Sequence, residues 1–345
     1  MIMASSTETK EAYVLVKNLQ KRFVDKLDAL SVELGENKKF KEVTWLRDEG
    51  THGGGSRFEA RDKKLFNSAS VNVSQVHYDE MPDKNLKSAT AISTIIHPKN
   101  PHVPSIHIHI SLTELRNEEP YWRVMADLNP SIVYEDDRKT FNLSLKELSK
   151  NRYEEGSMQG DKYFNIPVLQ RTRGISHFYL ENYKTDDKKA DIEFAKSFGE
   201  GIIDTYIDII QNAIKSKTEI STQDIQTQLE YHTLYLFQVL TLDRGTTSGL
   251  LIHNQNDIGI MGSLPSRIDK KLLKSYKEKV QKPQDELLQN ISNAINDKGI
   301  VNIQTKEKLA QVVREHYKKY KEALNLQASG NTTPTTVNNH QKSCI

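Results

Sequence analysis

The sequence has 345 residues, and its 48 basic and 46 acidic side chains leave a formal net charge of +2. This near balance argues against a nucleic-acid-binding protein, which usually carries a basic excess. No apolar run approaches the roughly 18 residues of a membrane span. The only cysteine is Cys344, which excludes an intrachain disulfide and fits a reducing cytoplasm.

The N-terminal part predicts a helix followed by a glycine-rich stretch. Between residues 11 and 30, apolar residues recur at helical spacing with charges between them. The first ten residues hold neither an apolar core nor an arginine-rich stretch, so no signal or transit peptide is expected. The run Gly53-Gly54-Gly55 lacks the lysine of a phosphate loop and the spacing of a dinucleotide-binding loop. It is interpreted as a turn between strands or as a loop that approaches a ligand closely.

The centre of the chain changes to a period of two, which predicts consecutive antiparallel strands at 65–78, 88–97, 105–115 and 121–128. In the third segment, the isoleucines from Ile106 to Ile110 take one face, while His107 and His109 take the other. Two further strands are expected at 163–168 and 174–181. A long amphipathic helix is expected near 190–215.

The C-terminal third is predicted to begin with strands at 233–242 and 248–252, joined by a turn at 243–247. Helical patterns follow from about 269 to 325. This order of elements predicts an α+β fold in which a large antiparallel sheet is flanked on both faces by helices. We expect a single domain over residues 1–327 and a disordered tail, rich in Ser, Asn and Thr, at 328–345.

Three histidines form the most suggestive polar cluster. His107 and His109 project from the same strand face, and with His97 they could share a metal ion. Together with Glu114 they imitate the ligand pattern of cupins, although the long helices argue against a cupin. A polar sheet face with solvated histidines explains the same pattern equally well.

A second polar set contains acidic and basic residues. Asp127 ends a predicted strand, Arg173 precedes a glycine, and Asp243 and Arg244 lie before Gly245. Each motif alone is compatible with an ion pair in a tight turn. Read together, these residues predict a concave polar site on one sheet.

Several motifs, in this order, resemble the oxygen-dependent coproporphyrinogen III oxidase family. The most specific is the segment 93–107, with the sequence STIIHPKNPHVPSIH. The others are Trp45 with 53–56, and the segments 71–77, 127–130, 173–174, 243–246 and 260–265. The resemblance extends from about residue 40 to 267, some two-thirds of the chain.

The resemblance implies an enzyme of haem biosynthesis that converts two propionates of coproporphyrinogen III to vinyl groups, giving protoporphyrinogen IX. Dioxygen would be the co-substrate, with carbon dioxide and hydrogen peroxide released. The expected protein is a cytoplasmic homodimer that associates through about 235–270, where many apolar residues lie. No motif for flavin, haem or nicotinamide is present in the sequence.

The resemblance also implies roles for individual residues. His107 would donate a proton, and Asp127 would hold the pyrrole N–H groups. The residues expected to bind substrate are Ser93, His109, Ser111, Arg173 and Arg244. Lys99 is a further candidate cation for the carboxylates. His97 and His107 would be the ligands if a divalent metal binds, which the sequence leaves open.

The chain departs from the family pattern at four site positions. Ser111 and Asn256 stand where the pattern has arginine, and Asn142 and Val168 stand where it has histidine. A four-histidine metal site therefore cannot form as in the family. Either Arg123 or Arg171 has rebuilt the anion-binding site, or the specificity has changed. The alternatives are a catalytically altered relative that binds a tetrapyrrole, and a His-x-His metal-dependent oxygenase outside the family.

Overall fold

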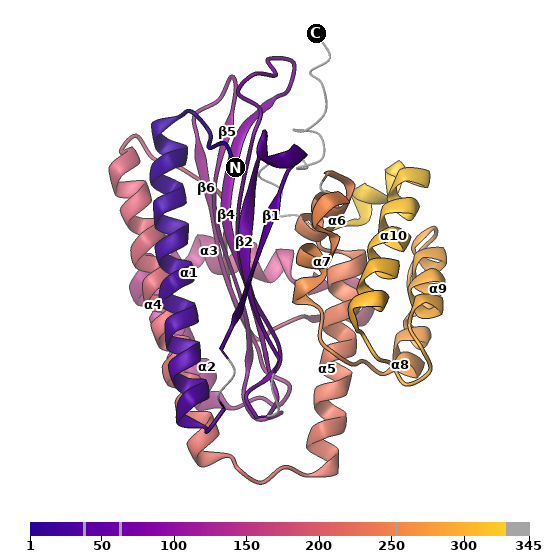
Figure 1. The fold of residues 1–345 in the computed structure, drawn as a ribbon. Coiled ribbons are helices and arrows are strands. Elements are labelled where there is room, and N and C mark those ends of the chain that lie inside the picture. The colour runs from indigo at the N-terminus through magenta and orange to yellow at the C-terminus, as the bar shows by residue number, and fades with distance from the viewer. Residues whose placement is uncertain (37–38, 62–63, 253, 329–345) are drawn as a thin grey trace.

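The structure is a computed structural model that describes residues 1–36, 39–61, 64–252 and 254–328. A seven-stranded antiparallel sheet lies at its centre, and the strand order β1-β2-β3-β4-β5-β6-β9 follows the order of the chain (Figure 1). The strands are β1 (Lys41–Leu46), β2 (Gly53–Ala60), β3 (Phe66–His77), β4 (Leu86–Pro98), β5 (Ser105–Leu115), β6 (Tyr121–Asn129) and β9 (Ser176–Tyr183). The predicted α+β class is therefore confirmed.

The four central strands β3 to β6 confirm the prediction from the period of two, and β9 confirms the strand expected at 174–181. The strand expected at 163–168 is reduced to β7 (Asn165–Ile166), which pairs with β8 (Arg171–Thr172) in a separate small sheet. The interpretation of Gly53-Gly54-Gly55 as a turn is wrong. These glycines open β2, where a Cβ atom on Gly55 would lie only 2.1 Å from the carbonyl oxygen of Val73. The glycine is needed because β2 and β3 approach closely there.

One face of the sheet is apolar and packs against helices α1 (Thr7–Glu33), α2 (Glu135–Ser149) and α4 (Lys188–Ser216). Figure 1 shows α1 and α4 side by side along this face. Every second residue of β5, from Ile106 to Leu112, is buried against them. Helices α1 and α4 confirm the sequence prediction, whereas α2 and the polar helix α3 (Tyr153–Tyr163), which packs on β9, were not predicted.

The opposite face is covered by the C-terminal helices (Figure 1). These are α5 (Thr222–Thr241), α6 (Arg244–Ile252), α7 (Asp257–Ile260), α8 (Lys270–Ser275), α9 (Gln284–Ala294) and α10 (Ile303–Lys319). Short 3-10 turns lie at Asp48–Gly50, Lys150–Arg152, Pro167–Leu169, Asn254–Asn256, Met261–Ser263, Tyr276–Glu278 and Lys321–Leu326. The strands predicted at 233–242 and 248–252 are wrong, because both segments are helical. All residues of α5 from Tyr231 to Thr241 are buried, so this helix has no polar stripe that would reveal its period.

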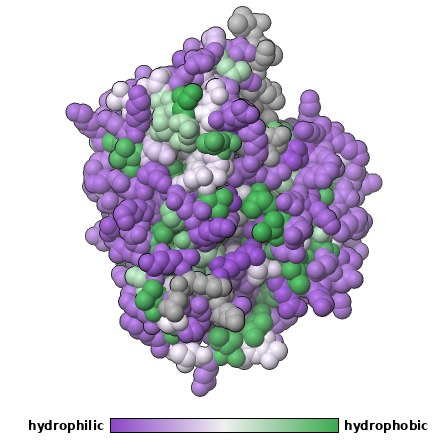
Figure 2. Space-filling model, viewed as in Figure 1, coloured by the Kyte–Doolittle hydropathy of each residue, from purple (hydrophilic) through white to green (hydrophobic). Residues whose placement is uncertain are grey.

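The apolar residues between 235 and 252 do not form an exposed patch. Tyr235, Phe237, Leu240 and Leu250 are buried within the chain, in a cluster built from α5 to α10. The many apolar residues on which the predicted dimer interface at 235–270 was based are therefore explained by internal packing. The face drawn in Figure 2 is mostly hydrophilic, with hydrophobic residues in small groups.

Within the described part of the chain, no helix combines the length and the apolar character that a membrane span requires. The predicted tail at 328–345 lies, apart from Ala328, outside the described residues.

Candidate functional site

A cavity of about 290 Å³ lies between the polar face of the sheet and the helices α5, α6 and α7. Its floor is formed by side chains of β3, β4, β5 and β6, and its roof by residues of α5 and of the segment from Asp243 to Ser263. The strand alternation explains the polar floor, because the same strands direct their apolar residues to the other face. Helices thus close a polar surface that a sheet alone would leave open to water.

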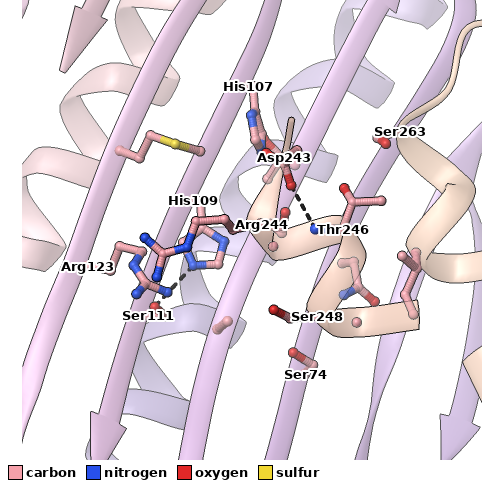
Figure 3. Close-up of a pocket in the computed structure, with 18 of the residues that line it drawn as sticks. Ser74, His107, His109, Ser111, Arg123, Asp243, Arg244, Thr246, Ser248 and Ser263 are labelled. Carbon is pink, nitrogen blue, oxygen red and sulfur yellow. Dashed lines mark hydrogen bonds between the residues drawn. The ribbon is translucent and has the colours of Figure 1, made fainter. Parts of the chain in front are cut away.

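The register of the central strands gathers the predicted residues on this floor (Figure 3). Ser93 on β4 lies opposite His109 on β5. Ser111 lies opposite Arg123 on β6, and both are labelled in Figure 3. Ser93, His107, His109 and Ser111 all line the cavity. The period of two in β5 thus predicted correctly that these side chains share one face.

His107 is held by a buried ion pair. The guanidinium of Arg173 donates from Nε and Nη2 to Asp127 Oδ2, at 2.9 and 2.5 Å, and Nη2 also lies 3.0 Å from His107 Nδ1. Because a guanidinium only donates, Nδ1 of His107 accepts and the ring proton resides on Nε2. Burial and the charge of Arg173 lower the pKa of His107 well below its usual value. His107 is therefore neutral in this environment.

Asp127 and Arg173 form an ion pair at the edge of the cavity, which Arg173 lines. Both side chains are fully buried, and Asp127 is absent from the described cavity wall. Arg173 also donates to Gln238 at 2.7 Å and lies between the rings of Phe164 and Tyr235. Its charge is thus balanced inside the protein. The contacts of Asp127 with pyrrole N–H groups and of Arg173 with a propionate stay predictions.

Two residues that the sequence did not single out extend the network. His177 Nε2 lies 3.5 Å from Asp127 Oδ1, and His177 Nδ1 lies 2.8 Å from Asp161 Oδ1. A Cβ atom on Gly174 would lie 2.4 Å from Asp127 Oδ1, so the Arg173-Gly174 motif permits a close approach of backbone to carboxylate. The alternation of β9, in which His177, Tyr179 and Glu181 share a face, is the signal that could have found His177.

The geometry of His97 does not fit a metal ligand. Its Nε2 donates to the carbonyl oxygen of Ser263, and its Nδ1 lies at hydrogen-bond distance from Ser105 Oγ, both at 3.0 Å. Nδ1 of His107 accepts from Arg173. Among the residues that the structure describes, no three His, Cys, Asp or Glu side chains form a group suited to a metal ion. The sequence-based metal site of His97 and His107 is therefore not supported by this geometry.

Arg244 does not lie in a turn, as predicted, but begins helix α6. It lines the cavity, and its Nη1 donates to Glu181 at 3.0 Å. Asp243 accepts from the backbone N–H of Thr246 at 2.7 Å, which fixes the start of the helix, and Tyr163 donates to its other oxygen. The Asp-Arg-Gly motif therefore places one acidic and one basic group in the roof of the cavity (Figure 3).

The remaining sequence candidates divide between the cavity and other surfaces. Asn256 lines the cavity and accepts a hydrogen bond from Arg57. The other candidates do not belong to the described cavity wall; they are Lys99, Asn142, Val168 and Arg171. Lys99 and Arg171 are exposed to solvent, whereas Arg123 lines the cavity. Sequence reasoning also missed the cavity residues Tyr163, Tyr179 and Glu181.

Comparison with known proteins agrees with this assignment of motifs. The family model described as coproporphyrinogen III oxidase matches residues 11–296. The oxygen-dependent coproporphyrinogen-III oxidase of Drosophila melanogaster is 29% identical over 276 residues, which cover 73% of this chain and 69% of the relative. The family match includes every strand of the central sheet and the helices that form the roof of the cavity. The protein therefore belongs to the coproporphyrinogen III oxidase family.

Proposed function

We propose that this protein catalyses the oxygen-dependent oxidative decarboxylation of coproporphyrinogen III to protoporphyrinogen IX, a step of haem biosynthesis. At each of two propionates, a C–H bond and the bond to the carboxylate carbon break, and a vinyl group and carbon dioxide form. The two electrons lost by the substrate reduce dioxygen, which takes up two protons to give hydrogen peroxide. The family match over residues 11–296 is the observation that carries this proposal.

The cavity suits a flat molecule with several carboxylates. Its floor is a sheet face with neutral polar groups such as Ser93 and His109, and Arg123 and Arg244 supply positive charge. Arginine binds carboxylates with directed, charge-assisted hydrogen bonds. A tetrapyrrole that lies on the sheet would thus contact strands and the α6 roof at the same time.

His107 acts as a neutral hydrogen-bond donor in this proposal. Arg173 occupies Nδ1, so that Nε2–H is the group left to meet the substrate, and Asp127 positions Arg173. Since burial lowers the pKa of His107 well below its usual value, it does not store a proton at neutral pH. His107 is thus a hydrogen-bond donor whose orientation the Asp127–Arg173 pair fixes.

The direct test is turnover of coproporphyrinogen III in air, with products oxidised and separated by chromatography. Protoporphyrin should accumulate through a tricarboxylic intermediate, with one dioxygen consumed for each propionate lost, and activity should survive dialysis against a chelator. His107→Gln should lower kcat by about 10²-fold. Absence of both products, with a known oxidase active alongside, would refute the proposed function. Loss of turnover in chelator that one metal restores would refute the metal-free reaction.

The assembly and location follow from the family resemblance. We propose a cytoplasmic homodimer with a mass about twice the 39.5 kDa of one chain. Because the apolar residues of α5 are buried internally, the interface must use other side chains of 235–270. Light scattering at micromolar concentration tests the assembly, and a monomer would contradict it.

A further inference from the structure

Three arginines line the cavity, and they differ in how their charge is balanced. Arg173 is paired with Asp127, and Arg244 is paired with Glu181. Arg123, which extends from β6 into the same space, forms no hydrogen bond or ion pair with any residue that the structure describes, and its Nε is buried without a partner. An unpaired guanidinium in a largely enclosed space is costly unless an anion joins it.

The immediate neighbours of Arg123 do not provide that anion. Ser111 lies directly opposite on β5, and its hydroxyl binds His109 Nε2 at 3.0 Å. Burial, followed by the charge of Arg123, lowers the pKa of His109 to about 3, so the ring is neutral. Glu181 interacts with Arg123 electrostatically but is already the ion-pair partner of Arg244. One carboxylate thus serves two guanidinium groups.

The protonation state of Arg123 is fixed. Burial lowers its pKa, but Tyr179, Tyr121 and Glu181 outweigh this effect and raise the pKa above the usual value for arginine. The group therefore carries a full positive charge at neutral pH. Figure 3 shows it beside Ser111 and His109 on the floor, with Arg244 reaching down from the roof.

We propose that Arg123 is a specificity-determining residue that binds one propionate carboxylate of the substrate, and this inference rests on the proposed function. Ser111 lies four residues from His107 along β5, a separation of roughly 13 Å at the rise of an antiparallel strand. This separation is comparable with the width of a tetrapyrrole ring. A substrate whose reacting propionate meets His107 would therefore place another carboxylate at Arg123.

The test measures binding of coproporphyrin III, the stable oxidised tetracarboxylate, by fluorescence titration. Arg123→Gln should raise the Kd by about 10- to 100-fold, the effect of losing a charge-assisted carboxylate contact. The matched control is Arg138→Gln, which changes an exposed arginine of α2 and should leave the Kd unchanged. Thermal unfolding of each variant verifies that it is folded.

A variant that moves the guanidinium to a neighbouring strand distinguishes the loss of a carboxylate contact from a general distortion of the cavity. Side chains directly opposite on antiparallel strands have Cβ atoms about 5 Å apart, so Ser111→Arg combined with Arg123→Ser moves the guanidinium only from β6 to β5. Arg123→Ser alone should bind weakly, and the double variant should regain most of the affinity.

Wild-type affinity in Arg123→Gln would overturn the inference. A folded double variant that binds as weakly as Arg123→Ser would do so as well. Wild-type protein that binds coproporphyrin III but does not turn over the porphyrinogen would instead refute the proposed function while leaving Arg123 as a carboxylate ligand.

Discussion

The two faces of the central sheet are made by the same strands but are stabilised by different interactions. On one face, Ile106, Ile108 and Ile110 pack with α1 and α4 into a continuous apolar core. On the other face, the alternate residues His107, His109 and Ser111 line a cavity under α5 and α6. The first face is held by burial of apolar area, and the second by a few hydrogen bonds and ion pairs.

This difference indicates that the two faces contribute to the stability of the fold in different ways. On the polar face, Asp127 and Arg173 are as deeply buried as any core residue, yet they stabilise the fold only as a pair. The stability of the polar face therefore depends on every buried charge keeping its partner. The stability of the apolar face depends on how fully its side chains fill the core.

The largest effect is expected from breaking the buried pair on the polar face. Asp127→Asn leaves the charge of Arg173 uncompensated, so the free energy of unfolding should fall by about 3–5 kcal/mol. His107 would lose its fixed orientation, and turnover should fall by about 10²-fold. Urea unfolding and steady-state kinetics measure the two effects. Asp161→Asn, which removes an exposed carboxylate beside His177, should stay close to wild type; wild-type stability and turnover in Asp127→Asn would contradict the assigned role.

Substitutions of two neighbouring residues of β5 compare the contributions of the two faces to the free energy of unfolding. Ile110→Ala creates a cavity in the apolar core and should cost about 2–5 kcal/mol of unfolding free energy. Ser111→Ala, one residue further, removes one hydrogen bond to His109 and should cost about 1 kcal/mol. Equal losses in urea unfolding would show that the polar face is packed as tightly as the apolar one.

A further contrast concerns the response of the fold to acid. Burial lowers the pKa of His232 on α5 to about 3, whereas an unfolded histidine titrates near 6.5. Below pH 6.5 the unfolded chain takes up a proton that the folded chain does not, so stability falls as the pH falls. Each such histidine contributes about 1.4 kcal/mol per pH unit. His232→Gln should reduce the slope of unfolding free energy against pH between 6.5 and 5 by about 1 kcal/mol per pH unit, and an unchanged slope would exclude this source.

The sheet could be predicted because its central strands present one apolar and one polar face. That pattern identified β3 to β6 and placed Ser93, His107, His109 and Ser111 on a common surface. The same alternation places Arg123 on the face of β6 that also carries Met125. The helices α1 and α4 were predicted for the analogous reason, since each buries one stripe and exposes the rest.

The C-terminal helices could not be predicted in this way. The segment from Tyr231 to Thr241 is buried on all sides, and its β-branched and aromatic residues resemble those of a strand. The contacts of the site were hidden for another reason. Nothing in the spacing of Asp127 and Arg173 reveals that they bind each other rather than a ligand, because their pairing depends on the return of β9 to the edge of β6.

The order of the strands has a consequence for how the chain assembles during synthesis. Strands β1 to β6 emerge in the order in which they pair, so each new strand can add to a hairpin already formed. Helix α1 is available from the start to shield the apolar face, and α4 joins it only after β9 has completed the sheet. The polar face stays uncovered the longest, until α5 and α6 are made, and its polar side chains can be hydrated during that time. The order of synthesis thus leaves the polar surface, which aggregates less readily, exposed for the longer time, and the cavity closes last.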